Sequence, residues 1–184
     1  MDNMKLWESV EKTNPAHTKA VTFGRKITAV DPYQQVKNAT AQFGPVGKGW
    51  GWSVERVEYL PTNELALLIR LWHGDKSNSF DHWGQASLFI DKAEKKKDTD
   101  CFKKATTDGV TKCLSFLGFN ADVFLGKFDD NKYIAQMKQE FDVSPPTDID
   151  RSWIDGVKSG TNKLEEITDT TYRSKIKSFI DKGA

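Results

Sequence analysis

Hydrophobic positions follow a helical period in the first part of the chain and a period of two further on. Residues 3–11 fit a short helix, and residues 25–30 fit a short strand. Asp31 followed by Pro32 is typical of a helix start, because aspartate caps the first turn and proline suits the first helical position. We expect this helix to run to Phe43 and to end at the Gly-Pro pair that follows.

From residue 50 onward the period of two predicts β-strands. In the first of these, one face is predicted to carry Trp50, Trp52, Val54 and Arg56, and the other Ser53, Glu55, Val57 and Tyr59. The apolar run 64–72 predicts a central strand, and residues 79–90 a third strand, with turns at 61–63 and 73–78. Short connections between the three strands predict an antiparallel meander.

A lysine-rich segment at 91–100 leads into an amphipathic helix at 101–118. Its apolar side includes the small residues Ala105 and Gly109, which would let the helix lie close to the sheet. Further helices are expected at 129–141 and, after a Ser-Pro-Pro break, in the tail.

The order of these elements predicts an α+β fold. Its centre would be an antiparallel three-stranded β-meander packed by one helix, with additional C-terminal helices. We predict a core domain at residues 1–143 and a C-terminal helical extension at 144–184.

The composition fits a globular protein, with 38% hydrophobic and 29% charged residues among 184. No apolar run approaches the roughly 18 residues of a membrane span, and the N-terminal stretch lacks an apolar export signal, so we expect a cytoplasmic protein. On one helix, Cys101 and Cys113 would lie about 18 Å apart, too far for a disulfide, and we interpret both as reduced and buried. The net charge of +1 favours no partner by itself.

The glycine-rich stretch 43–52, FGPVGKGWGW, does not match a phosphate-binding P-loop. A P-loop needs Ser or Thr after its lysine and connects a strand to a helix. Here Gly49 follows Lys48, and the stretch connects a helix to a strand. We interpret it as a turn, in which Lys48 is a candidate contact for a backbone phosphate.

Signals for catalysis or for a metal site are missing from the sequence. The three histidines have no spacing typical of metal ligands, and no nucleophile motif such as G-x-S-x-G is present. We therefore predict no enzyme activity, no cofactor and no bound metal.

Aromatic and basic residues suggest two further interpretations. Four tryptophans lie in predicted strands, where they either fill the core or stack on nucleic-acid bases, and the core interpretation is favoured. Six lysines fall within 91–104 against four acids, and Lys112 extends the polar face of the following helix. Such a run is either a solvated face or a phosphate-binding surface.

The helix at 103–118, KKATTDGVTKCLSFLG, resembles the signature helix of single-strand annealing proteins of the Rad-fifty-two-like superfamily, which includes phage recombinases. The segment 31–44, DPYQQVKNATAQFG, followed by Gly-Trp, is similar to another helix and turn of that family. The resemblance covers about residues 25–120, including the meander between the two helices.

This resemblance implies a β-β-β-α annealing fold that assembles into homo-oligomeric rings or filaments. Single-stranded DNA would lie in a groove between the sheet and the signature helix, and complementary strands would be annealed in homologous recombination without ATP. The expected partners are single-stranded DNA, the annealed duplex and, in phage members, a host single-strand-binding protein or an exonuclease. A phage-encoded member would act in the cytoplasm of its bacterial host.

Several positions depart from the family pattern. Thr111 and Ser115 stand where the family presents basic residues, while Lys112 keeps its charge. Gln34 stands at an arginine position, with Lys37 one turn later. The candidate substitutes for the missing charges are Lys48, Arg56, Arg70, Lys103 and Lys104. The alternative function is a non-enzymatic adaptor domain that binds protein and makes no contact with DNA.

Overall fold

The computed structural model describes residues 3–23, 25–91, 93–141 and 146–181. The chain forms two compact units: unit 1 comprises Met1–Thr13 and His17–Leu125, and unit 2 comprises Asn14–Ala16 and Gly126–Ala184. The predicted domain boundary at 143–144 lies outside the described residues. No helix in the described ranges is both long and apolar enough to cross a lipid bilayer.

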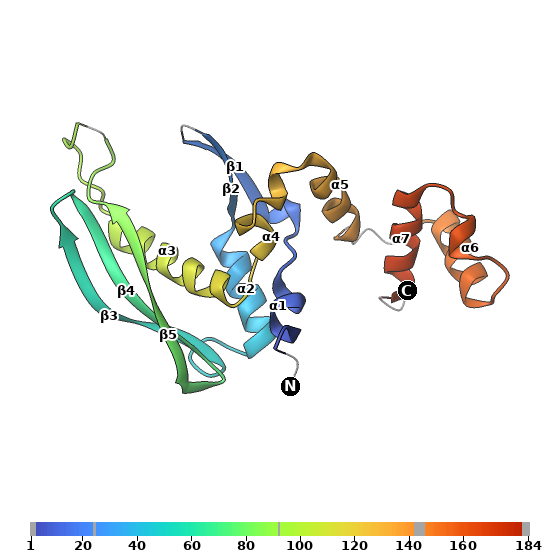
Figure 1. Ribbon diagram of the computed structural model, residues 1–184, viewed down its shortest axis with the longest axis horizontal. Coiled ribbons are helices and arrows are strands. Elements are labelled where there is room, and N and C mark those ends of the chain that lie inside the picture. Colours follow the sequence, from blue (N-terminus) through green and yellow to red (C-terminus); the bar gives the residue numbers. More distant parts are fainter. Residues whose placement is uncertain (1–2, 24, 92, 142–145, 182–184) are drawn as a thin grey trace. The chain divides into compact units, whose positions relative to one another are not determined.

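Unit 1 contains the predicted three-stranded antiparallel sheet, in the order β3-β4-β5 (Figure 1). Its strands are β3 (Trp50–Leu60), β4 (Glu64–His73) and β5 (Asp75–Ser87). The third strand begins earlier than the sequence predicted, because His73 pairs with Asp75 around Gly74. Gly74 has φ +71°, a conformation that glycine adopts without strain, so a tight turn replaces the expected loop at 73–78.

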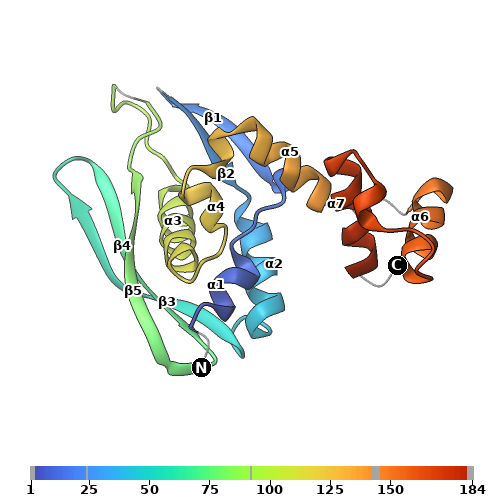
Figure 2. The ribbon, with the colours of Figure 1, turned by 45° about the vertical axis from the view of Figure 1, so that its right-hand side comes forward.

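The helix α3 (Cys101–Phe116) covers one face of this sheet, which we call the inner face (Figures 1 and 2). The approach is close because Gly109 and Gly84 have no side chains. A Cβ at Gly109 would collide with Ile69, and one at Gly84 would collide with the backbone of Ala105 and Gly109. The core beneath α3 includes alternate residues of β4, namely Leu65, Leu67, Ile69 and Leu71. Cys101 and Cys113 are buried and unbridged, as predicted.

A β-bulge corrects the predicted faces of β3. The register shifts between Val54 and Arg56, which leaves Glu55 as the extra residue. Arg56 was expected on the same face as Val54, but the bulge turns it to the outer face of the sheet. Tyr59 turns inward instead, and its ring meets Phe102 of α3 at a centroid distance of 6.5 Å.

The helix α2 (Pro32–Phe43) lies on the side of α3 away from the sheet (Figure 2). It begins as predicted, since the side chain of Asp31 accepts a hydrogen bond from the Tyr33 N–H at 2.9 Å. It ends at Gly44, whose N–H donates to the Thr40 carbonyl. The strand β2 (Arg25–Val30) was also predicted, but its antiparallel partner β1 (Thr18–Phe23) was not.

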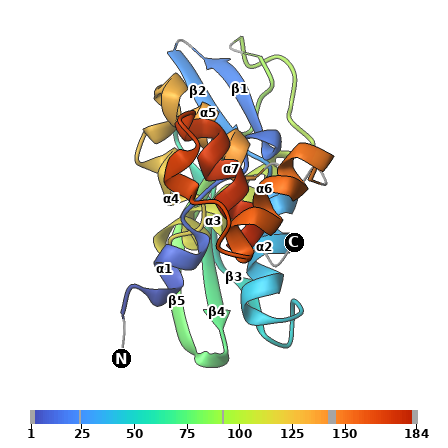
Figure 3. The same cartoon turned by 90° about the vertical axis from the view of Figure 1, so that its right-hand side faces the viewer.

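The β1–β2 hairpin projects at one end of unit 1, and the turn between β4 and β5 lies at the opposite end (Figure 3). The short helices α1 (Lys5–Val10) and α4 (Ala121–Phe124) complete this unit. Trp7 of α1 packs against Gly118, which follows α3. The N-terminal segment therefore supports the C-terminal end of α3.

Unit 2 contains α5 (Asn131–Glu140), α6 (Asp148–Lys158) and α7 (Thr170–Asp181). The sequence predicts one or two helices in the tail, and the structure has two there, α6 and α7. They pack around Ile154, Ile167, Ile176 and Phe179.

Asp150 is a buried charged residue of α6 that bonds to Lys175 of α7 within unit 2. Burial by itself would raise the pKa of this carboxyl, but hydrogen bonds from the Thr147 backbone N–H and from Lys175 Nζ outweigh burial and lower the pKa to about 2. The Asp150 carboxyl is therefore ionised more readily in the folded protein than in the unfolded chain, where its pKa is 3.8. Its contribution to stability is therefore present above about pH 4 and is lost as the pH falls toward about 2.

We expect Asp150→Asn to destabilise unit 2 by about 2 kcal/mol at neutral pH, because the ionised carboxylate is lost as the acceptor of Lys175. Amide hydrogen exchange in α6 and α7 of the full chain measures this effect. Asp148→Asn, on the same helix and fully exposed, is the control and should leave exchange almost unchanged. Equal protection in both variants would contradict this role of Asp150.

Candidate nucleic-acid interface

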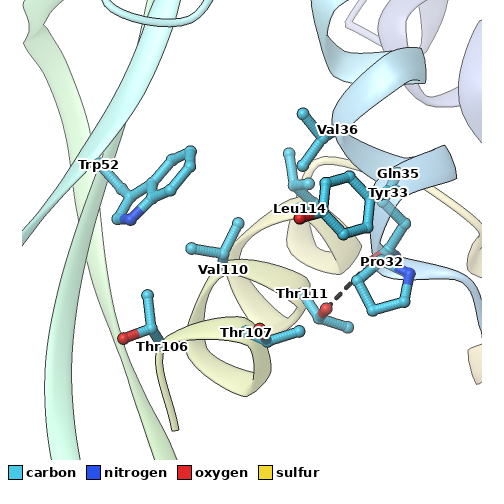
Figure 4. A pocket seen from close by; sticks show the side chains of 10 residues that line it. All are labelled: Pro32, Tyr33, Gln35, Val36, Trp52, Thr106, Thr107, Val110, Thr111 and Leu114. Atoms are coloured by element: carbon cyan, nitrogen blue, oxygen red, sulfur yellow. Dashed lines mark hydrogen bonds between the residues drawn. The ribbon is translucent and has the colours of Figure 1, made fainter. Parts of the chain in front are cut away.

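An aromatic pocket of about 250 Å³ lies where α2, α3 and β3 meet. Figure 4 shows the indole of Trp52 entering from β3 and the ring of Tyr33 from α2, with Val110 and Leu114 of α3 between them. The aromatic pocket is lined by Pro32, Tyr33, Gln35, Val36, Trp52, Thr106, Thr107, Val110, Thr111 and Leu114.

A second hollow of about 530 Å³, the lysine hollow, adjoins the aromatic pocket along α3. The two share Thr107 and Thr111. The lysine hollow is lined by Asp100, Lys103, Lys104, Thr107, Asp108 and Thr111. Its residues come from the first three turns of α3 and the position before it, so one helix joins the cationic and aromatic surfaces.

A third hollow of about 620 Å³, the edge hollow, adjoins the aromatic pocket at Trp52. It lies along β3, an edge strand of the sheet. The edge hollow is lined by Val46, Gly47, Gly51, Trp52, Ser53, Arg70, Trp72 and Lys76. The aromatic pocket and the lysine hollow form one surface, which we call the track. The edge hollow meets the track only at Trp52, because Ser53, Arg70 and Trp72 lie on the outer face of the sheet.

The lysines of the track are paired with acids at their own end of α3. Lys104 Nζ lies 2.6 Å from Asp98, and Lys103 Nζ lies 2.8 Å from Asp100. The hydrogen bond from Lys104 lowers the pKa of Asp98, and the bond to Asp98 raises the pKa of Lys104. Both lysine side chains are nevertheless exposed, at 59% for Lys104 and 83% for Lys103. Both partners of the Lys103–Asp100 pair are exposed, so this pair is weak enough to exchange for a phosphate partner. Asp98 is buried, so Lys104 would have to reach a phosphate while it stays beside this carboxylate.

Arg70 lines the edge hollow, but it faces away from α3. Its guanidinium donates to both carboxylate oxygens of Asp81 at 2.8 Å and to Glu55 at 3.2 Å. The hydrogen bond to Asp81 raises the pKa of Arg70. With two carboxylates against one guanidinium, the edge hollow presents no net positive charge from Arg70. Lys76, whose Nζ lies 5.9 Å from the Trp72 ring centre, supplies the cation there.

The aromatic residues of the track are accessible to a ligand. The Tyr33 residue is 86% exposed and Trp52 is 36% exposed. The favoured core interpretation of the strand tryptophans is confirmed for Trp50, which is fully buried, but not for Trp52 or Trp83, which are exposed. Trp72 is half-buried. Trp52 differs from Trp50 because it lines the aromatic pocket from the edge strand β3.

Local sequence signals place Tyr33 and Gln35 at this opening. The Asp31 cap and the adjacent proline fix where α2 starts, so Tyr33 lies in its first turn. Gln35 is only 1% exposed and accepts a hydrogen bond from the Thr111 hydroxyl of α3 at 2.9 Å. This bond ties the first turns of α2 to the middle of α3.

The structure brings together three of the predicted contact residues along the track: Lys103, Lys104 and Thr111. Arg70 lines the edge hollow on the outer face instead, and the others line none of the three hollows. Lys112 Nζ lies 5.7 Å from the Phe124 ring centre, and the Ser115 hydroxyl donates to the Lys112 carbonyl. The remaining predicted residues are Gln34 and Lys37 on α2, Lys48 in the glycine-rich turn, and Arg56 on the outer face over Trp83.

Sequence reasoning missed Tyr33 and Gln35 as site residues. Both flank position 34, where the resemblance points to Gln34 instead. The capped helix start places both residues in the first turns of α2, but it does not show that these turns face α3.

Among the described residues, no group of three or more His, Cys, Asp or Glu side chains is placed to hold a metal ion. His73 stacks on Phe43 at 4.6 Å, and its burial lowers the pKa of the imidazole.

A scan against protein-family models found no match, and a search of curated proteins found no significant relative. The likeness to single-strand annealing proteins therefore rests on the residue patterns alone. The residues of the track are therefore the basis for a functional proposal.

Proposed function

We propose that unit 1 binds single-stranded DNA along the track and promotes annealing of complementary strands without ATP. The observation that carries this proposal is the pair of accessible aromatic rings, Tyr33 and Trp52, beside a pocket that adjoins exposed lysines. Aromatic side chains stack on bases of any sequence, and lysines bind the phosphates between them.

The binding energy has two physical sources. Neutralising phosphates with lysines releases counterions, so affinity falls as salt rises. Stacking on an aromatic ring contributes about 1–3 kcal/mol per base. Neither requires a covalent step, and a strand held this way keeps most of its bases free to test a second strand for pairing.

We also propose that copies of the chain assemble into a homo-oligomer, a ring or filament. A single track offers few cations, and Asp98 and Asp100 partly offset Lys104 and Lys103. Repeating the track in neighbouring copies would multiply the phosphate contacts along one strand. Native mass spectrometry with and without an oligonucleotide tests this assembly, and a monomer under both conditions would contradict it.

A fluorescent single-stranded oligonucleotide, in buffer without ATP or divalent metal, tests the proposed function. We expect a rise in anisotropy on titration with the protein, and accelerated pairing when the complementary strand is added. The adaptor alternative predicts no anisotropy change at any protein concentration at which the chain stays folded.

Removing the charges of the lysine hollow should change the salt dependence in a defined way. In Lys103→Ala/Lys104→Ala, the slope of log affinity against log salt should become shallower by about 1.4, since each single-strand phosphate contact contributes about 0.7. The matched control is Lys132→Ala/Lys177→Ala, which removes two exposed helical lysines of unit 2. An equal change in both double variants would mean that net charge, and not the lysine hollow, governs binding.

A further inference from the structure

The aromatic pocket contains a buried polar atom without a partner. Gln35 Nε2 is a buried amide donor that makes no hydrogen bond within the part of the chain that the structure describes. Its own Oε1 accepts a hydrogen bond from the Thr111 hydroxyl at 2.9 Å. Leaving such a donor unpaired is costly, so a buried orphan lining a pocket points to a ligand that accepts its proton.

We propose that the aromatic pocket receives one nucleobase of the bound strand and that thymine fits it best. This inference rests on the proposed function, and it adds a base preference to it. The base would insert between the rings of Tyr33 and Trp52, which Figure 4 shows on opposite sides of Val110. Its leading edge would then face the rest of the pocket lining, which includes Gln35 and the apolar side chains.

Edge-first insertion decides which atoms of the base reach Gln35. The sugar is attached at the opposite side, so a pyrimidine enters with the edge formed by positions 4 and 5. Thymine presents a carbonyl oxygen and a methyl group there, whereas cytosine presents an amino donor. The thymine carbonyl would accept a hydrogen bond from Gln35 Nε2. The cytosine amine would instead place a donor against this donor, so no hydrogen bond could form.

The apolar lining matches the methyl group of thymine. Val36 of α2 and Val110 and Leu114 of α3 line the same pocket as Gln35. Aliphatic side chains are the usual contact of this methyl group. Because uracil lacks the methyl, the same pocket would bind deoxyuridine less tightly, which also favours DNA over RNA.

Three homopolymers separate these contributions in the wild-type protein: oligodeoxythymidylate, oligodeoxyuridylate and oligodeoxycytidylate of equal length. We expect thymidylate to bind about threefold more tightly than uridylate, from burial of the methyl group. Uridylate should bind about fivefold more tightly than cytidylate, from the hydrogen bond to Gln35.

The variant Gln35→Met keeps the volume of the side chain and removes the orphan donor. It should abolish the preference for uridylate over cytidylate, by weakening uridylate binding and by removing the donor that opposes the cytosine amine. Its thermal midpoint should stay close to that of the wild type, because removal of an unpaired buried donor offsets loss of the bond from the Thr111 hydroxyl. A merely structural glutamine would give the opposite result, a lower midpoint with unchanged selectivity.

The outcomes distinguish this inference from the proposed function. Equal affinity for all three homopolymers, or a preference that survives in Gln35→Met, overturns the thymine pocket and leaves strand binding in place. No binding to any homopolymer overturns both. If Gln35→Met does not fold, comparing the affinity of the wild-type protein for uridylate and for cytidylate still tests the thymine pocket.

Discussion

Replacing both Tyr33 and Trp52 with alanine should weaken binding of single-stranded DNA by about 100-fold or more. Stacking on each ring contributes about 1–3 kcal/mol, and the two rings flank the same pocket. Titration of a labelled oligonucleotide at fixed salt measures the loss. Circular dichroism should show a folded protein, because Tyr33 is almost fully exposed and Trp52 is partly exposed.

Trp83 provides a matched control for this loss. It is 38% exposed, close to the 36% of Trp52, but it lies on the outer face of the sheet beneath Arg56. Trp83→Ala should leave affinity within about twofold of the wild type. A large loss in Trp83→Ala, with normal binding by the Tyr33→Ala/Trp52→Ala protein, would place the interface on the outer face.

Gly84→Ala should destabilise unit 1 by about 3 kcal/mol, with a fall in thermal midpoint of roughly 10 °C. The new Cβ would collide with backbone atoms of Ala105 and Gly109, which have no rotamer by which to move away. The helix α3 would have to shift from the sheet, and with it the floor of the aromatic pocket. Thermal unfolding followed by circular dichroism measures the change.

Gly47→Ala separates this steric effect from the general cost of replacing a glycine. Gly47 has φ +83° and open space around its Cβ position, so only backbone strain applies, about 1 kcal/mol. A midpoint for Gly84→Ala no lower than that for Gly47→Ala would contradict the close contact between α3 and β5.

Much of unit 1 could be predicted from the sequence because its elements carry strong local signals. The start of α2 was predicted to the residue, since Asp31 and Pro32 each favour a helix start. The strand β4 and the helix α3 were predicted because long apolar patterns leave one interpretation. The coarse class, α+β with a three-stranded antiparallel sheet, is confirmed.

The features that the sequence did not predict depend on pairing between segments. No sequence pattern marks the bulge at Glu55. The bulge nevertheless turns the side chains of the second half of β3, including Arg56, to the face opposite the predicted one. The strand β1 is short and exposed, so its pattern is weak until β2 pairs with it. The aromatic pocket combines Tyr33, Trp52 and Val110, from three elements whose approach no sequence pattern fixes.

The location of the bound strand is the most direct test of the track. We would cross-link a single-stranded oligonucleotide that carries photoreactive 5-iododeoxyuridine, and identify the attached peptides by mass spectrometry. We expect cross-links at Tyr33 or Trp52, with none in unit 2. Cross-links confined to unit 2 or to the outer face at Trp83, or no cross-link at all, would contradict strand binding along the track.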